Sequence, residues 1–158
     1  MYDPNKAWRI PEEIMVGSGY DIIRNEGEIS VTLKAADPYG LVQSSILAMG
    51  SLLTNAKTSG MFWEASCLLF AGNGRNELLG RLWAELLYHL RHDQLSVVKA
   101  TVAEFTETKL AVECFFSTEF TPGSLLLGPE WLTGHVASPS CAEIGDRWVA
   151  TIIWHSAS

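Results

Sequence analysis

The stretch FWEASCLLFAGNGRNELLGRLWAELLYHLRH, residues 62–92, decides the fold class of this chain. Its first part alternates in the way that is typical of a strand with one buried face. The residues that this pattern places on the buried side are Trp63, Ala65, Cys67, Leu69 and Ala71. Gly72-Asn73-Gly74 then breaks the strand, and leucines recur at every fourth position from Leu78 to Leu90. This spacing predicts an amphipathic helix directly after the strand.

Further elements are predicted on the N-terminal side of this unit. Residues 28–35 alternate strictly, which indicates a strand with one buried and one wet face. Asp37-Pro38 suits a helix start, because Asp37 can cap the free amides and proline fits the first helical position. The apolar stripe of that helix is Val42, Ile46, Met49, Leu53 and Ala56.

On the C-terminal side, residues 97–105 and 110–120 predict a β-hairpin whose second strand buries Cys114. Residues 147–155 predict a last strand that is apolar on both faces and therefore central in its sheet. The resulting order predicts an α+β sandwich. Its two amphipathic helices would pack on one mixed, largely antiparallel sheet of about five strands.

Length and composition suit one domain over residues 1–158, with an irregular arm at 1–25 and a long loop at 124–146. Hydrophobic residues make up 47% and charged residues 18%, so part of the apolar surface is expected to be covered by a partner. The net charge of -7 repels nucleic-acid backbones and anionic membranes. With no signal-like or membrane-spanning apolar run, we expect a cytoplasmic or virion protein.

The glycine turn at Gly72-Asn73-Gly74-Arg75 is the first candidate site, because free amides at a helix start can hold a phosphate. However, Glu77 stands where a dinucleotide fingerprint needs its third glycine, and no P-loop lysine follows. The simpler interpretation is a tight turn with Asn73 as a cap, and we predict no cofactor.

A second candidate lies at the end of the same helix. Glu85, His89 and His92 are spaced by four and three, so they share one helical face and could ligate a metal. His135 or Glu143 could join them only if the fold brings them near. A solvated charged face is the simpler interpretation, and no metal site is predicted.

The cysteines offer a third candidate. Cys67 and Cys114 fall on predicted buried faces and read as inert thiols, whereas Cys141 lies in the long loop six residues after His135. A Cys–His pair could support nucleophilic catalysis, but nothing near Cys141 indicates an activating environment. No catalytic residue is predicted.

Apolar residues in the arm and the long loop are the predicted partner contacts. Trp8 and Trp131 sit in segments without periodicity, where an interface and a satellite core are equally open. The predicted partner-binding residues are Trp8, Ile10, Leu125, Leu126 and Trp131.

The sequence therefore predicts a non-catalytic protein-interaction or assembly protein. We expect a homo-oligomer or a subunit of a larger assembly, such as a phage or virus neck or tail component. One alternative is an acidic inhibitor or immunity protein that covers a basic partner. Another is a small enzyme or ligand-binding domain that uses Glu85, His89 and His92.

Overall fold

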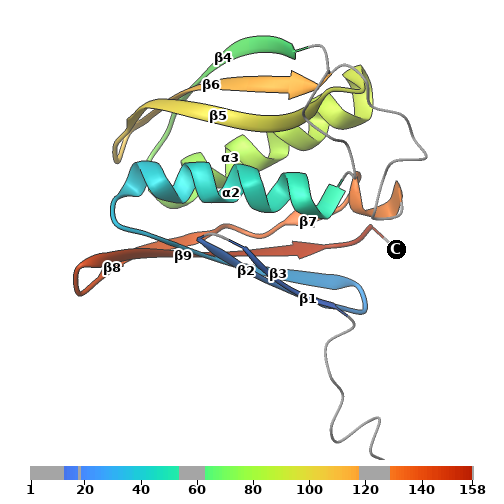
Figure 1. Cartoon of the computed structure of the whole chain (residues 1–158), viewed down its shortest axis with the longest axis horizontal. Helices are drawn as coiled ribbons and strands as arrows, with labels where there is room; N and C mark the ends of the chain where they lie inside the picture. The colour runs from blue at the N-terminus through green and yellow to red at the C-terminus, as the bar shows by residue number, and fades with distance from the viewer. Residues whose placement is uncertain (1–12, 18, 54–62, 118–128, 158) are drawn as a thin grey trace, which may run out of the picture.

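Two antiparallel sheets enclose two helices in the computed structural model of this protein (Figure 1). The structure describes residues 13–17, 19–53, 63–117 and 129–157. The α+β class predicted from the sequence is confirmed. The expected single sheet is wrong, because a second sheet covers the other side of the helices.

The larger sheet has six strands in the order β1-β2-β3-β9-β7, with β8 also paired to β9. Its strands are β1 (Glu13–Gly17), β2 (Tyr20–Asn25), β3 (Glu28–Ala35), β7 (His135–Val136), β8 (Ser140–Ile144) and β9 (Arg147–His155). The central place predicted for the last strand is confirmed, since β9 pairs with β3 on one side and with both β7 and β8 on the other.

Two segments expected to be irregular contribute strands to this sheet. The described part of the N-terminal arm forms the β1–β2 hairpin. The described part of the long loop contains β7, β8 and the 3-10 turn η3 (Pro129–Trp131). Backbone pairing with β9 explains this difference for β7 and β8, because short strands carry little periodicity of their own.

The helices form the middle layer. Helix α2 (Pro38–Leu53) begins after Asp37, whose carboxylate accepts a 2.9 Å hydrogen bond from the Gly40 N–H, as a capping residue should. Helix α3 (Arg75–Tyr88) continues into a π-helical turn, η1 (His89–Asp93). The predicted core positions Val42, Ile46 and Met49 of α2 are buried. No helix in the described ranges is long and apolar enough to cross a membrane.

The smaller sheet contains β4 (Trp63–Ala71), β5 (Ser96–Phe105) and β6 (Lys109–Ser117), in the order β4-β6-β5. The predicted burial of Cys114 on β6 is confirmed, and Leu110, Val112 and Phe116 are buried on the same face. Strand β4 differs from expectation, because Cys67 is exposed and Leu69 is 71% exposed.

The register with β6 explains the orientation of β4. Leu68 lies opposite Val112 and Phe70 lies opposite Leu110, so these two β4 residues share the inward face with buried partners. Because Leu68, Leu69 and Phe70 are consecutive, both faces of β4 are apolar and alternation alone does not select one. The side that the sequence assigned to the core therefore faces outward.

Candidate interaction surface

The outward side of β4 forms an exposed apolar area with the middle strand of its sheet. Ala65 lies opposite Phe115, and Leu69 lies opposite Ala111. The outer β4 surface, as we name it, consists of Ala65, Cys67, Leu69 and Ala71 of β4 with Ala111 and Phe115 of β6. Its four β4 residues are exposed. Contiguous apolar exposure of this kind marks binding sites more often than scattered single residues do.

Charged side chains on this face gather toward β5. The ammonium of Lys99 lies 4.9 Å from the centre of the Phe115 ring, and Lys109 Nζ lies 3.4 Å from Glu104 Oε2. Glu113 stands between the two regions, opposite Cys67 and Thr101. Strand β4 lies at one edge of this sheet (Figure 1), so the apolar part of the face, to which its outward-facing residues belong, borders its free edge.

The free edge of β4 presents backbone groups as well as apolar side chains. The N–H of Gly72 donates to the carbonyl oxygen of Thr108 at 3.0 Å, so even-numbered positions of β4 bond toward β6. Successive residues of a strand alternate in direction, which turns the N–H and C=O groups of Ala65, Cys67 and Leu69 toward the edge. Within the described ranges, no strand pairs with that edge.

The two edges of the smaller sheet differ in how they are protected. The register of β5 with β6 is interrupted twice, between Val97 and Lys99 and between Val102 and Glu104. Bulges and charges of this kind discourage pairing with another strand. The register of β4 with β6 is unbroken from Trp63 to Ala71, and β4 carries no charge after Glu64.

Trp131 lies in the core, which favours the satellite-core alternative for this residue. It is 3% exposed, and its ring meets that of Trp154 edge to face at 5.4 Å. The guanidinium of Arg24 lies 5.9 Å from the Trp131 ring centre. Trp131 thus presents no surface to a partner. The other predicted partner-binding residues, Trp8, Ile10, Leu125 and Leu126, lie outside the described residues.

Glu85 of α3 and the two histidines of η1, His89 and His92, are not arranged as a set of metal ligands. His89 Nδ1 lies 2.9 Å from Asp93 Oδ2, and His89 Nε2 lies 3.3 Å from Glu85 Oε1. His92 instead accepts a 3.3 Å hydrogen bond from Arg91 Nε. Among the residues that the structure describes, no three histidine, cysteine or acidic side chains are grouped to hold a metal ion.

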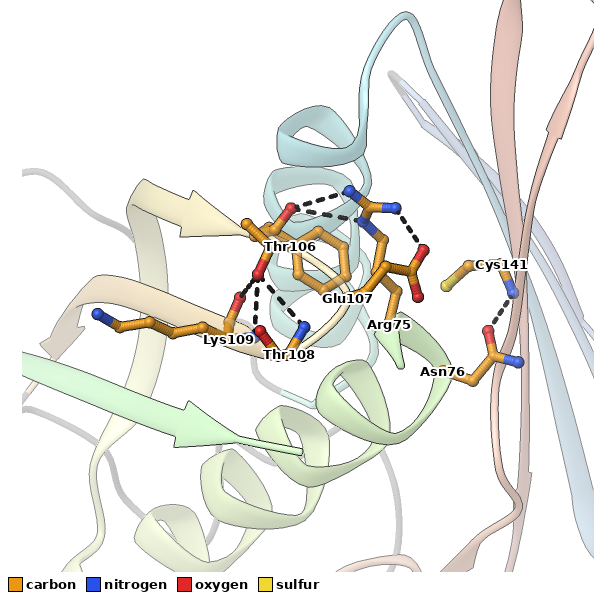
Figure 2. Close-up of polar contacts among 8 residues, drawn as sticks. Arg75, Asn76, Thr106, Glu107, Thr108, Lys109 and Cys141 are labelled. Atoms are coloured by element: carbon orange, nitrogen blue, oxygen red, sulfur yellow. Dashed lines mark hydrogen bonds and ion pairs between the residues drawn. The ribbon is translucent and has the colours of Figure 1, made fainter. Parts of the chain in front are cut away.

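The glycine turn before α3 makes internal contacts, and Figure 2 shows those of Arg75, the residue that follows it. Gly74 adopts a φ of 115°, which favours glycine, and the N–H of Asn73 donates to Glu77 Oε2 at 3.1 Å. The expected Asn cap is therefore wrong, since no side chain caps at the helix start and Glu77 accepts instead. Arg75 pairs with Glu107 at 2.9 Å and donates to the carbonyl oxygen of Phe105.

Cys141 lies beside the ion pair of Arg75 and Glu107, and its thiol is protonated. Its backbone N–H donates to Asn76 Oδ1 at 2.7 Å, and its side chain lies near the Arg75–Glu107 pair (Figure 2). Burial raises the pKa of the Cys141 thiol to about 11, although Arg75 opposes that rise. A nucleophilic cysteine needs a lowered pKa, so this environment does not activate it.

A groove of about 490 Å³ runs between α3 and the segment through β7. Its lining includes Arg81, Arg91, His135 and Glu77. Arg81 donates to the carbonyl oxygen of Ala71, and Arg91 donates to that of Leu132 at 3.5 Å. Both guanidinium groups thus satisfy backbone acceptors, and Glu77 adds a negative charge that disfavours an anion.

Comparison with known proteins gives a fold and no activity. No protein-family model and no curated protein sequence matches this chain. The chain is similar to the solution structure of protein 1598 of Methanobacterium thermoautotrophicum, with a TM-score of 0.59 and 13% sequence identity. The match covers 87% of this chain and 98% of that one. At this identity, the likeness shows a shared fold alone.

Proposed function

We propose that this protein is a non-catalytic protein-interaction protein that binds through the outer β4 surface and the free edge of β4. The observation that carries the proposal is the exposure of Leu69, 71%, in an apolar area beside an unprotected strand edge. Burying such an area contributes roughly 25 cal/mol per Å². A strand edge adds backbone hydrogen bonds, which is how extended segments dock on sheets.

The environments of the candidate catalytic groups also support a binding role. Burial keeps Cys141 protonated, His89 is held between Glu85 and Asp93, and Arg75 is paired with Glu107. We propose that the protein acts as one subunit of a larger assembly, in the cytoplasm or in a virion.

Site-specific photocrosslinking tests this proposal. A benzophenone amino acid is placed at position 69 of the full chain, expressed in the cells that make the protein. Position 144 is the matched control, because Ile144 is also apolar and 63% exposed but lies in β8 of the other sheet. Irradiation should give a discrete protein adduct at position 69 and none at 144. Equal labelling, or none at position 69, would contradict the proposal.

A further inference from the structure

We propose that the free edge of β4 pairs with β4 of a second copy of this chain, in antiparallel fashion about a two-fold axis. The inference rests on the proposed function and names the partner. Strand β4 has nine residues, Trp63–Ala71, so full overlap with an antiparallel copy places the middle residue, Cys67, opposite its own equivalent. Two-fold pairing uses the same edge on both copies and leaves neither β4 edge unpaired.

The backbone groups are compatible with this register. The N–H and C=O groups of Ala65, Cys67 and Leu69 point toward the edge, as the Gly72 to Thr108 hydrogen bond indicates, whereas the carbonyl oxygen of Ala71 accepts from Arg81. In the full-overlap register, Cys67 faces Cys67 of the second copy, and Ala65 faces Leu69. Odd-numbered positions of one copy therefore lie opposite odd-numbered positions of the other, so the N–H groups at one edge can donate to the C=O groups at the other. The smaller sheet would extend from three strands to six across the axis.

Two copies of a chain with a net charge of -7 repel each other over much of their surfaces. The side chains of β4 avoid this repulsion and therefore favour pairing of β4 with its own copy. Between Ala65 and Ala71 the strand has no charged residue, so no like charges face each other. The apolar outer β4 surfaces of the two copies would become continuous across the axis.

Charge complementarity at the ends of the strand gives a second, independent argument. In the full-overlap register Glu64 lies opposite Phe70 of the second copy, on the same face of the sheet. The guanidinium of Arg81 lies 5.6 Å from the Phe70 ring centre in each copy. The two-fold axis would therefore bring Glu64 of each copy to Arg81 of the other. A partner strand lacking an acidic residue at this position would leave Arg81 without that contact.

Solution mass is the first test. Sedimentation equilibrium of the purified full chain should give twice 17.4 kDa. Leu69→Pro should give a monomer with wild-type circular dichroism, because the N–H that it removes points to the free edge rather than to β6. Leu69→Lys provides a second variant if proline disturbs folding, and Ile144→Lys should stay dimeric. A wild-type monomer at every concentration would overturn the inference.

Crosslinking tests the register. A short bis-maleimide should link wild-type copies through Cys67, the exposed thiol, since antiparallel partners lie about 5.5 Å apart between Cα atoms. Cys67→Ser should abolish the link, and Cys141→Ser should retain it. A dimer that links through Cys141 instead, or not at all, would overturn the register.

Charge reversal tests the ion pair across the axis. Glu64→Arg and Arg81→Glu should each weaken dimerisation at least several-fold, and the double variant should recover most of it. If the losses of dimer affinity in the two single variants simply add in the double variant, the ion pair between Glu64 and Arg81 across the axis is contradicted.

The outcomes separate this inference from the proposed function. If the chain is monomeric but position 69 crosslinks to a different protein, the second copy is the wrong partner and the binding role stands. If the chain is monomeric and position 69 crosslinks to nothing, both fail.

Discussion

Leu69 lies opposite Ala111 on the outside of the three-stranded sheet, while its neighbour Phe70 lies opposite buried Leu110 on the inside. Leu69 is 71% exposed and Leu110 is fully buried. Leu69 and Leu110 belong to adjacent cross-strand pairs but lie on opposite faces of the sheet, so they have different roles. One contributes to the core and the other to the surface that we propose binds a partner.

Substitution of these two leucines should separate stability from binding. At protein concentrations low enough for both wild type and variant to be monomeric, Leu69→Lys should change the free energy of unfolding by less than about 0.5 kcal/mol, because the side chain loses little buried contact within the monomer. Leu110→Ala should cost about 2–5 kcal/mol through the cavity it leaves in the core. Urea denaturation of both variants measures this difference. A loss above about 2 kcal/mol for Leu69→Lys under these conditions would mean that Leu69 is buried within the monomer.

Trp131→Ala should destabilise the monomer by about 3–5 kcal/mol, because it removes a buried ring that packs on Trp154. Trp131→Phe should cost less, since part of the aromatic contact is retained. Thermal or urea unfolding measures both. Wild-type stability for Trp131→Ala, combined with weaker assembly, would restore the interface alternative.

Arg75→Met should destabilise the protein more than Glu107→Gln does. Glu107 is 73% exposed at its side chain, so the ion pair alone contributes about 0–1 kcal/mol. Arg75 also donates to Phe105 O and lies 5.0 Å from the Trp148 ring centre, contacts that Glu107→Gln leaves in place. A double-mutant cycle on urea unfolding separates these contributions. Equal losses for the two single variants would place the whole effect in the ion pair.

Burial raises the pKa of the Cys114 thiol to about 12, with a smaller rise from Cys67. The folded state therefore keeps this proton after the unfolded chain has lost it. The contribution of the Cys114 thiol to the free energy of unfolding is fully present below about pH 9. It is lost as pH rises toward 12, by at most about 1.4 kcal/mol per pH unit. Urea unfolding between pH 8 and about 10.5 should show a shallower decline in Cys114→Ala. Equal slopes would contradict the raised pKa.

Particular residues show what could be predicted from the sequence. The strict alternation of residues 28–35 and the leucine repeat from Leu78 to Leu90 each bury one face, so their strand and helix could be predicted. The Asp37 cap could also be predicted, because it depends on local chemistry. In contrast, β7 and β8 depend on pairing with β9 across the long loop, which no local pattern encodes.

The candidate surface was missed for a similar reason. The run Leu68-Leu69-Phe70 places apolar side chains on both faces of β4, and a strand covered on one side must expose one of them. That run was the available signal. Which face turns outward depends on the register with β6, where Leu68 meets Val112. The aromatic packing of Trp131 on Trp154 is likewise a tertiary contact between distant segments.

The most direct test of the binding role is native mass spectrometry of the protein isolated from the cells that make it, as wild type and as Leu69→Lys. We expect the wild-type chain to be held in a complex and the variant to be released at 17.4 kDa with a wild-type circular dichroism spectrum. Ile144→Lys should behave as wild type. The same mass for wild type and Leu69→Lys would contradict a binding role for the outer β4 surface.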